Sequence, residues 1–98
     1  MSTFVLTYRA PKGYTIGSPE VMPQWRAFFE GMGASISDLG KPVMEASVLG
    51  NAGTDTRLGG YTVITAEDLE AAISIAKGCP FLGIGGGVEV GLLGEVPA

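Results

Sequence analysis

The sequence contains no histidine, a single cysteine, and few charged residues, which account for 16% of its 98 positions. Histidine is the usual acid–base side chain near neutral pH and a frequent ligand of transition metals. Its absence excludes Ser–His–Asp and Cys–His mechanisms. We also expect no metal site, because the ten acidic residues are dispersed and no second cysteine is present. The residue types therefore do not point to one reaction.

The charge balance and the apolar runs exclude two further classes of function. The formal net charge is −4 and the basic residues are not clustered, so the sequence lacks the basic patch that binds a nucleic-acid backbone. No apolar run approaches the roughly 20 residues of a membrane span, and the N-terminus lacks the pattern of a signal peptide. A lone Cys79 forms no internal disulfide. We expect a cytoplasmic protein with no cofactor and no membrane partner.

Hydrophobic periodicity predicts four strands and two helices. β-Branched and aromatic residues indicate strands at 3–9, at 60–65 and at 88–93. Residues 34–38 and 43–49 indicate either one interrupted strand or a strand with a short extension. A first helix begins either at 18–20, where Ser18 is a candidate cap, or near Pro23, and ends at the glycines 31 and 33. A second helix follows a capping box at 65–68, with Leu69, Ala72, Ile73 and Ala76 as its apolar stripe. The glycine-rich segment 82–87 is in the wrong place for a dinucleotide-binding loop and is interpreted as a return loop.

The order of these elements predicts the fold class. Two successive β-α-β units favour a single α+β domain over residues 1–98, a ferredoxin-like βαββαβ antiparallel sheet. Right-handed crossovers place both helices on one face of the sheet. The other face is then open to water or to a partner.

The alternation of side chains along each strand assigns residues to the two faces. One set is assigned to the helix-covered face: Phe4, Leu6, Tyr8, Tyr61, Val63, Val88, Val90 and Leu92. The opposite set includes Val5, Ile64 and Leu93, which are unfavourable in water. We therefore expect a homodimer whose two sheets face each other, and a monomer at micromolar concentration in sedimentation would contradict this expectation.

Five residues are candidates for a ligand site, each with a structural alternative: Arg9, Trp25, Asp38, Tyr61 and Glu89. Arg9 and Glu89 form either a cross-strand ion pair or the polar corner of a cleft. Trp25 is either a core aromatic or a pocket wall, and Asp38, which clusters with Lys41 and Glu45, is either solvated or a desolvated general base. Tyr61, like Tyr8, is assigned to the helix-covered face, where its hydroxyl requires a partner. Cys79 has no histidine as its base and is interpreted as structural.

A resemblance to a known family lies in residues 58–64, Ala71-Ala72, 76–80 and 87–90, with looser agreement at Trp25, 33–34 and the turn 38–42, and so spans nearly the whole chain. On these residues the sequence resembles the YCII-related family, which includes a branch named for an Asp-Gly-Pro-Phe segment. The resemblance implies a ferredoxin-like protomer that pairs as a dimeric α/β barrel. Some members are similar to small dehalogenating or lactone-processing enzymes with a proposed His–Asp pair, which this chain lacks. The Asp-Gly-Pro-Phe segment is replaced by residues 53–56, and Gly91 stands where many members have arginine.

Three hypotheses of function follow. The first is a homodimer that binds a small molecule in a cleft between helix, sheet and partner, without catalysis. The second is a lyase or isomerase that uses Asp38 or Glu89 as its base. The third is a structural or regulatory accessory domain. Fold alone does not choose among them.

Overall fold

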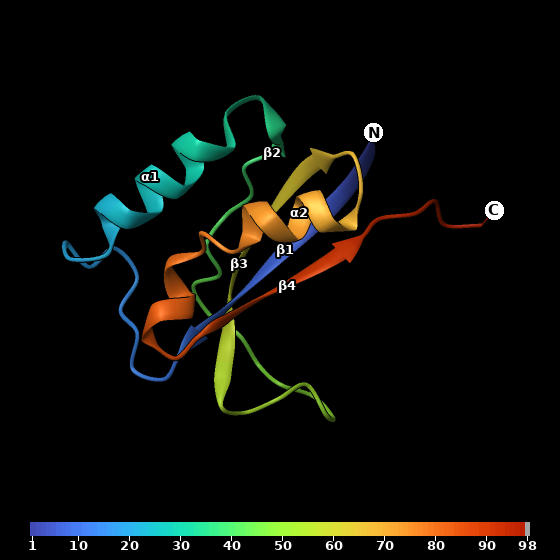
Figure 1. The fold of residues 1–98 in the computed structure, drawn as a ribbon. Helices are drawn as coiled ribbons and strands as arrows, with labels where there is room; N and C mark the ends of the chain where they lie inside the picture. The colour runs from blue at the N-terminus through green and yellow to red at the C-terminus, as the bar shows by residue number, and fades with distance from the viewer. Residues whose placement is uncertain (98) are drawn as a thin grey trace.

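The strands form one antiparallel sheet in the order β2-β3-β1-β4. The computed structural model describes residues 1–97. In chain order the elements are β1 (Ser2–Pro11), α1 (Met22–Met32), η1 (Gly33–Ser35), β2 (Ile36–Asp38), β3 (Thr56–Ala66), α2 (Leu69–Ala76), η2 (Pro80–Ile84) and β4 (Gly87–Leu92), where η1 and η2 are 3-10 helices. This arrangement confirms the predicted ferredoxin-like α+β class (Figure 1).

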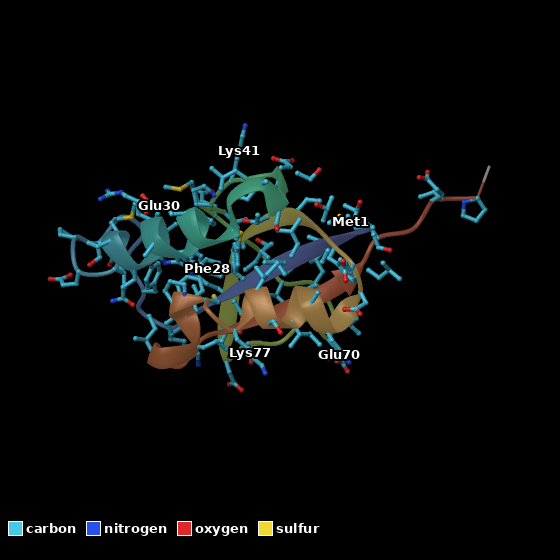
Figure 2. All side chains as sticks on the ribbon, turned by 45° about the horizontal axis from the view of Figure 1, so that its top comes forward. Met1, Phe28, Glu30, Lys41, Glu70 and Lys77 are labelled. Atoms are coloured by element: carbon cyan, nitrogen blue, oxygen red, sulfur yellow. The ribbon has the colours of Figure 1, made fainter. Side chains whose placement is uncertain are left out.

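The core lies between the sheet and the two helices. Alternate residues of β1 (Phe4, Leu6 and Tyr8) pack in one buried cluster with residues of both helices, so α1 and α2 cover the same face. Figure 2 shows Phe28 directed into this layer, whereas the charged residues Lys41, Glu70 and Lys77 are exposed. Because β1 occupies a central position, its inward side chains reach both helices.

Helix α1 begins at the later of the two predicted starts. Pro23 lies in its first turn, where a missing backbone N–H costs nothing. Ser18 is not the cap: its carbonyl accepts the N–H groups of Val21 and Met22 in a preceding turn. Trp25, Phe28 and Met32 are buried at helical spacing, and this stripe directs α1 onto the sheet.

Helix α2 is capped by a different residue from the one predicted. The Asp68 side chain accepts the N–H of Ala71, while Thr65 belongs to β3. The predicted capping box at 65–68 is therefore wrong by three residues. Only half of the predicted stripe is buried, since Ala72 and Ala76 face the core and the larger Leu69 and Ile73 remain exposed.

The second predicted strand is mostly absent. Only Ile36–Asp38 pairs with β3, and 43–49 is irregular and largely exposed. An isolated bridge joins Pro42 to Gly60, and Val43 donates its N–H to the Gly59 carbonyl. Because proline has no N–H to donate, Pro42 does not support a continuing ladder.

The face assignment of β3 is the reverse of the prediction. Thr62 and Ile64 are fully buried toward the helices, whereas Tyr61 and Val63 pair with Thr7 and Val5 on the open face. Thr62 is tolerated in the core because its hydroxyl has two partners, described below. The open face therefore carries Val5, Val63 and Tyr61 in place of Ile64, and it remains partly apolar.

Candidate functional site

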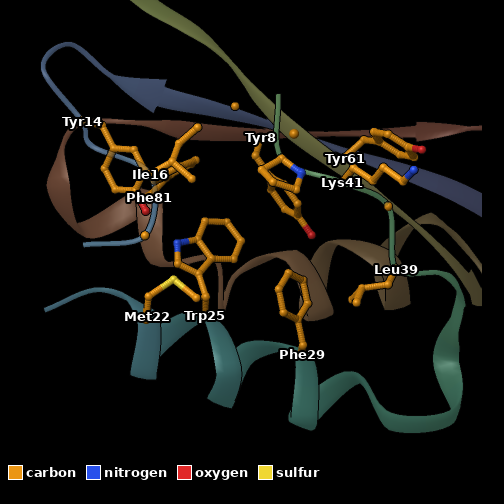
Figure 3. A pocket seen from close by; sticks show the side chains of 15 residues that line it. Tyr8, Tyr14, Ile16, Met22, Trp25, Phe29, Leu39, Lys41, Tyr61 and Phe81 are labelled. Atoms are coloured by element: carbon orange, nitrogen blue, oxygen red, sulfur yellow. The ribbon is translucent and has the colours of Figure 1, made fainter. Parts of the chain in front are cut away.

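A mostly apolar pocket of about 270 Å³ lies between α1 and the adjoining end of the sheet (Figure 3). Six parts of the chain enclose it: helix α1, the 14–17 loop, the segment 39–42, the strands β1 and β3, and η2. Met22, Trp25 and Phe29 come from α1. A volume of this size is close to the lower end of the range for small-molecule sites.

Aromatic rings form the rigid wall of this pocket. The Trp25 ring meets Tyr8 and Phe81 edge-to-face, each at a centroid distance of 4.9 Å. Tyr14 packs edge-to-face on Phe81 at 4.8 Å, and Phe29 lies 5.6 Å from Trp25. Such contacts are favourable beyond the area they bury. The wall is therefore held in place by its own packing before any ligand binds.

The segment 39–42 is fixed by a close approach of two backbones. Gly40 has φ +77°, and a Cβ built on it would lie 1.7 Å from the Tyr61 carbonyl oxygen. On the facing strand, a Cβ on Gly60 would lie 2.9 Å from the Lys41 carbonyl oxygen. Only glycine allows both approaches. This contact holds Leu39 and Lys41 at the edge of the pocket.

A hydrogen-bonded chain crosses the pocket wall. The Tyr8 hydroxyl donates to Thr62 Oγ1 at 2.8 Å, and Thr62 Oγ1 donates to the Leu39 carbonyl at 2.9 Å. Burial raises the pKa of Tyr8 to about 12, despite the opposing effect of the Thr62 hydrogen bond. Tyr8 is therefore a protonated phenol at neutral pH.

Charge is scarce in the pocket. Among its lining residues in the described part of the chain, Lys41 is the single side chain with a formal charge, and no carboxylate lines it. Lys41 is exposed at the rim, beside Tyr61 (Figure 3). A neutral or anionic ligand fits this lining better than a cation.

Arg9 and Glu89 lie in a separate, shallow polar groove on the open face of the sheet. Their strands are antiparallel neighbours as expected, but the register pairs Arg9 with Gly87 and Glu89 with Thr7. The Arg9 guanidinium donates from Nε to Thr56 Oγ1 at 3.0 Å and from Nη2 to the Thr56 carbonyl at 2.7 Å. Arg9 thus holds the start of β3, and no ion pair with Glu89 forms within residues 1–97.

The structure thus separates the five candidates into three places. Trp25 lines the helix–sheet pocket from α1, and Tyr61 borders it from β3, although the β3 register assigns the Tyr61 side chain to the open face. Arg9 and Glu89 line the groove on the opposite face. Asp38 is exposed and accepts the Gly40 N–H at 2.9 Å, so it shapes the 39–42 turn without lining the pocket.

Sequence reasoning missed several lining residues, notably Tyr14, Ile16, Leu39 and Phe81. All four lie in segments interpreted as loops or turns, where periodicity gives no signal. Phe81 follows Pro80 in η2, whose N-cap residue is the buried Cys79. Burial raises the pKa of the Cys79 thiol, which agrees with its predicted structural role.

Within residues 1–97, no three His, Cys, Asp or Glu side chains gather in a way that would hold a metal ion. Among the helices of the described chain, none has the length and apolar character needed to cross a membrane.

The chain was then compared with known proteins. The model of a family described as the YCII-related domain matches residues 3–93. Among solved structures, the chain is similar to 5-chloro-2-hydroxyhydroquinone dehydrochlorinase (TftG) from Burkholderia phenoliruptrix AC1100, in a complex with 2,5-dihydroxybenzoquinone. That match has a TM-score of 0.64 and 22% sequence identity, and covers 90% of this chain and 89% of that chain. No curated protein sequence matches the chain.

Proposed function

The chain belongs to the YCII-related family, and from that premise we propose that it binds a small planar aromatic molecule in the pocket between α1 and the sheet. The observation that carries this proposal is the rigid aromatic wall of Trp25, Tyr8 and Phe81, which lines a pocket of about 270 Å³. Stacking and edge contacts would hold such a ring. A fold that is similar to a protein crystallised with a dihydroxybenzoquinone makes quinones and hydroquinones the first compounds to test.

The lining favours binding over catalysis by a carboxylate base. Of the two carboxylates considered from the sequence, Asp38 is exposed outside the pocket and Glu89 lies on the opposite face. A general base must reach the proton that it removes within hydrogen-bond distance. The lyase or isomerase alternative therefore has no base placed at this pocket.

Trp25 provides the test, since it is the only tryptophan in the sequence and lines the pocket. Titration with hydroxybenzoates and hydroquinones is expected to change its fluorescence in a saturable way. Free N-acetyltryptophanamide, measured alongside, controls for absorption by the ligand. The absence of saturation up to millimolar concentrations would overturn the proposal.

A matched pair of variants locates the binding. Ile16→Asp places a carboxylate in the pocket lining and should abolish the saturable change. Ile84→Asp makes the same change at an exposed residue of η2 outside the lining, and should bind like the wild type. An equal loss of the saturable fluorescence change in both variants would show that the ligand does not bind in this pocket.

We further propose that the protein is a homodimer joined through the open faces of the two sheets, as a dimeric α/β barrel. The support is the partly apolar character of that face, where Val5, Val63 and Tyr61 are left uncovered by the protein's own helices.

Sedimentation tests this assembly. The wild type is expected to sediment as a dimer at micromolar concentration, and Val63→Lys as a monomer. Val96→Lys, in the exposed C-terminal segment, should remain dimeric. A monomeric wild type would contradict the assembly without affecting the pocket, which one protomer forms alone.

We propose a cytoplasmic location for this activity. The support is the free, buried Cys79, which fits a reducing compartment. Cell fractionation that recovers the protein outside the cytoplasm would contradict it.

A further inference from the structure

The hydrogen-bonded chain from Tyr8 through Thr62 to Leu39 has only one possible direction. The Leu39 carbonyl oxygen accepts and never donates, so the proton between Leu39 and Thr62 belongs to Thr62. A threonine hydroxyl carries one proton, which this bond uses. The proton between Tyr8 and Thr62 must therefore come from Tyr8.

The direction of these hydrogen bonds determines whether Tyr8 can donate or accept a hydrogen bond in the pocket. Its single proton is engaged with Thr62, so the phenolic oxygen has only lone pairs left for a ligand. Tyr8 lines the pocket, and Figure 3 shows its hydroxyl directed past Phe29 toward the side on which Leu39 lies. The raised pKa of Tyr8 keeps the phenol protonated at physiological pH, so the arrangement persists there. The inner part of the pocket thus presents a hydrogen-bond acceptor and no matching donor from Tyr8.

The rim of the pocket, near solvent, presents hydrogen-bond donors instead of an acceptor. Lys41 lies at the rim, and its ammonium carries three donors and no acceptor. Tyr8 is 4% exposed and Lys41 is exposed, so the acceptor is deep and the cation is near solvent. Between these two ends the wall is aromatic.

We propose that the pocket selects a hydroxyarene anion: an aromatic ring with a hydroxyl that donates to the Tyr8 oxygen and, across the ring, an anionic oxygen group that faces Lys41. The proposal rests on the pocket being the ligand site, and it adds the orientation and the two polar substituents. A ligand that lacks the donor leaves the buried Tyr8 oxygen without its second partner, and this loss is what gives selectivity.

Four compounds separate the two contacts when they are titrated calorimetrically against the wild type: 4-hydroxybenzoate, 4-fluorobenzoate, benzoate and 4-methylphenol. 4-Fluorobenzoate keeps the ring and the carboxylate and lacks the donor. We expect it and benzoate to bind about tenfold more weakly than 4-hydroxybenzoate. We expect 4-methylphenol, which lacks the anion, to bind more weakly than 4-hydroxybenzoate as well.

Three variants assign the contacts to residues. In Tyr8→Phe the preference for 4-hydroxybenzoate over 4-fluorobenzoate should disappear. In Thr62→Val the Tyr8 proton is released, so the same preference should shrink while Tyr8 is still present. In Lys41→Met the benzoates should bind more weakly, whereas the affinity for 4-methylphenol should not change. Lys12→Met, in the exposed turn after β1, should leave all four affinities unchanged.

The outcomes are distinguishable. If all four compounds bind with equal affinity and the Ile16→Asp variant abolishes binding, the ligand site stands and the selectivity for a hydroxyarene anion is overturned. A preference that survives in both Tyr8→Phe and Thr62→Val overturns the role of the hydrogen-bonded chain. If no compound binds at all, the proposed function fails together with this inference.

Discussion

At the scale of single residues, Thr62 and Tyr8 explain most of what is unusual about the pocket. A fully buried threonine beside a buried phenol is unfavourable unless both hydroxyls are paired. Their mutual bond and the Leu39 carbonyl satisfy this requirement. The sequence predicted that the Tyr8 hydroxyl would need a partner, which is confirmed. It did not predict Thr62 as that partner, because the two residues are 54 positions apart and Tyr61 and Val63 are the more apolar neighbours.

The raised pKa of Tyr8 makes stability depend on alkaline pH. The folded chain holds the phenolic proton more tightly than the unfolded chain, whose phenol titrates near pH 10. This contribution is fully present below pH 10 and is lost as the pH rises toward 12. Urea unfolding should show the wild type losing about 1 kcal/mol more than Tyr8→Phe between pH 9 and pH 11. Tyr61→Phe, which removes an exposed phenol, should retain the wild-type loss, and equal losses in wild type and Tyr8→Phe would contradict the account.

At the scale of elements, the segment 39–42 is set by backbone contact rather than by strand pairing. Residues 38–42 were recognised in the sequence as a turn, but the continuation of a strand over 43–49 was wrong. Apolar residues such as Val43 and Val48 resemble a strand in composition, yet Pro42 removes the N–H that a ladder would need. The extent of β2 therefore depends on pairing partners in β3 that composition does not reveal.

Substitution of Gly40 tests this contact. Gly40→Ala should lower the free energy of unfolding by roughly 2–4 kcal/mol, because the Cβ meets the Tyr61 carbonyl and φ is positive. Gly13→Ala has a similar φ of +79° and meets nothing within 4 Å, so it should cost about 1 kcal/mol. Equal costs in urea unfolding would show that the close approach is unimportant.

The start of α2 gives a second prediction at this scale. Asp68→Ala removes the side chain that accepts the Ala71 N–H at 2.8 Å and should cost about 1 kcal/mol of stability. Glu67→Ala, at the exposed preceding residue, should change stability by less than about 0.5 kcal/mol. A larger loss at Glu67 than at Asp68 in thermal unfolding would contradict the assignment of Asp68 as the cap.

At the scale of the whole molecule, the element order was sufficient to predict the ferredoxin-like fold, because two β-α-β units with right-handed crossovers permit few alternatives. The site was predicted only in part. Trp25 and Tyr61 were named as candidates and line the pocket, but Arg9 and Glu89 lie across the sheet from it. The alternation of side chains along β1 and β4 had assigned Arg9 and Glu89 to the open face, and β3 is the strand whose assignment was reversed.

The central claim is that the molecule holds its ligand between α1 and the sheet, and amide-resolved NMR tests it most directly. On addition of 4-hydroxybenzoate, the account predicts saturable shifts of the Trp25 indole N–H and of the amides of Gly17, Gly40 and Gly59, all of which line the pocket. The amide chemical shifts of Gly86 and Gly87, in the groove on the open face, should not change. Shifts confined to Gly86, Gly87 and Glu89, or no shifts at saturating concentrations, would contradict it.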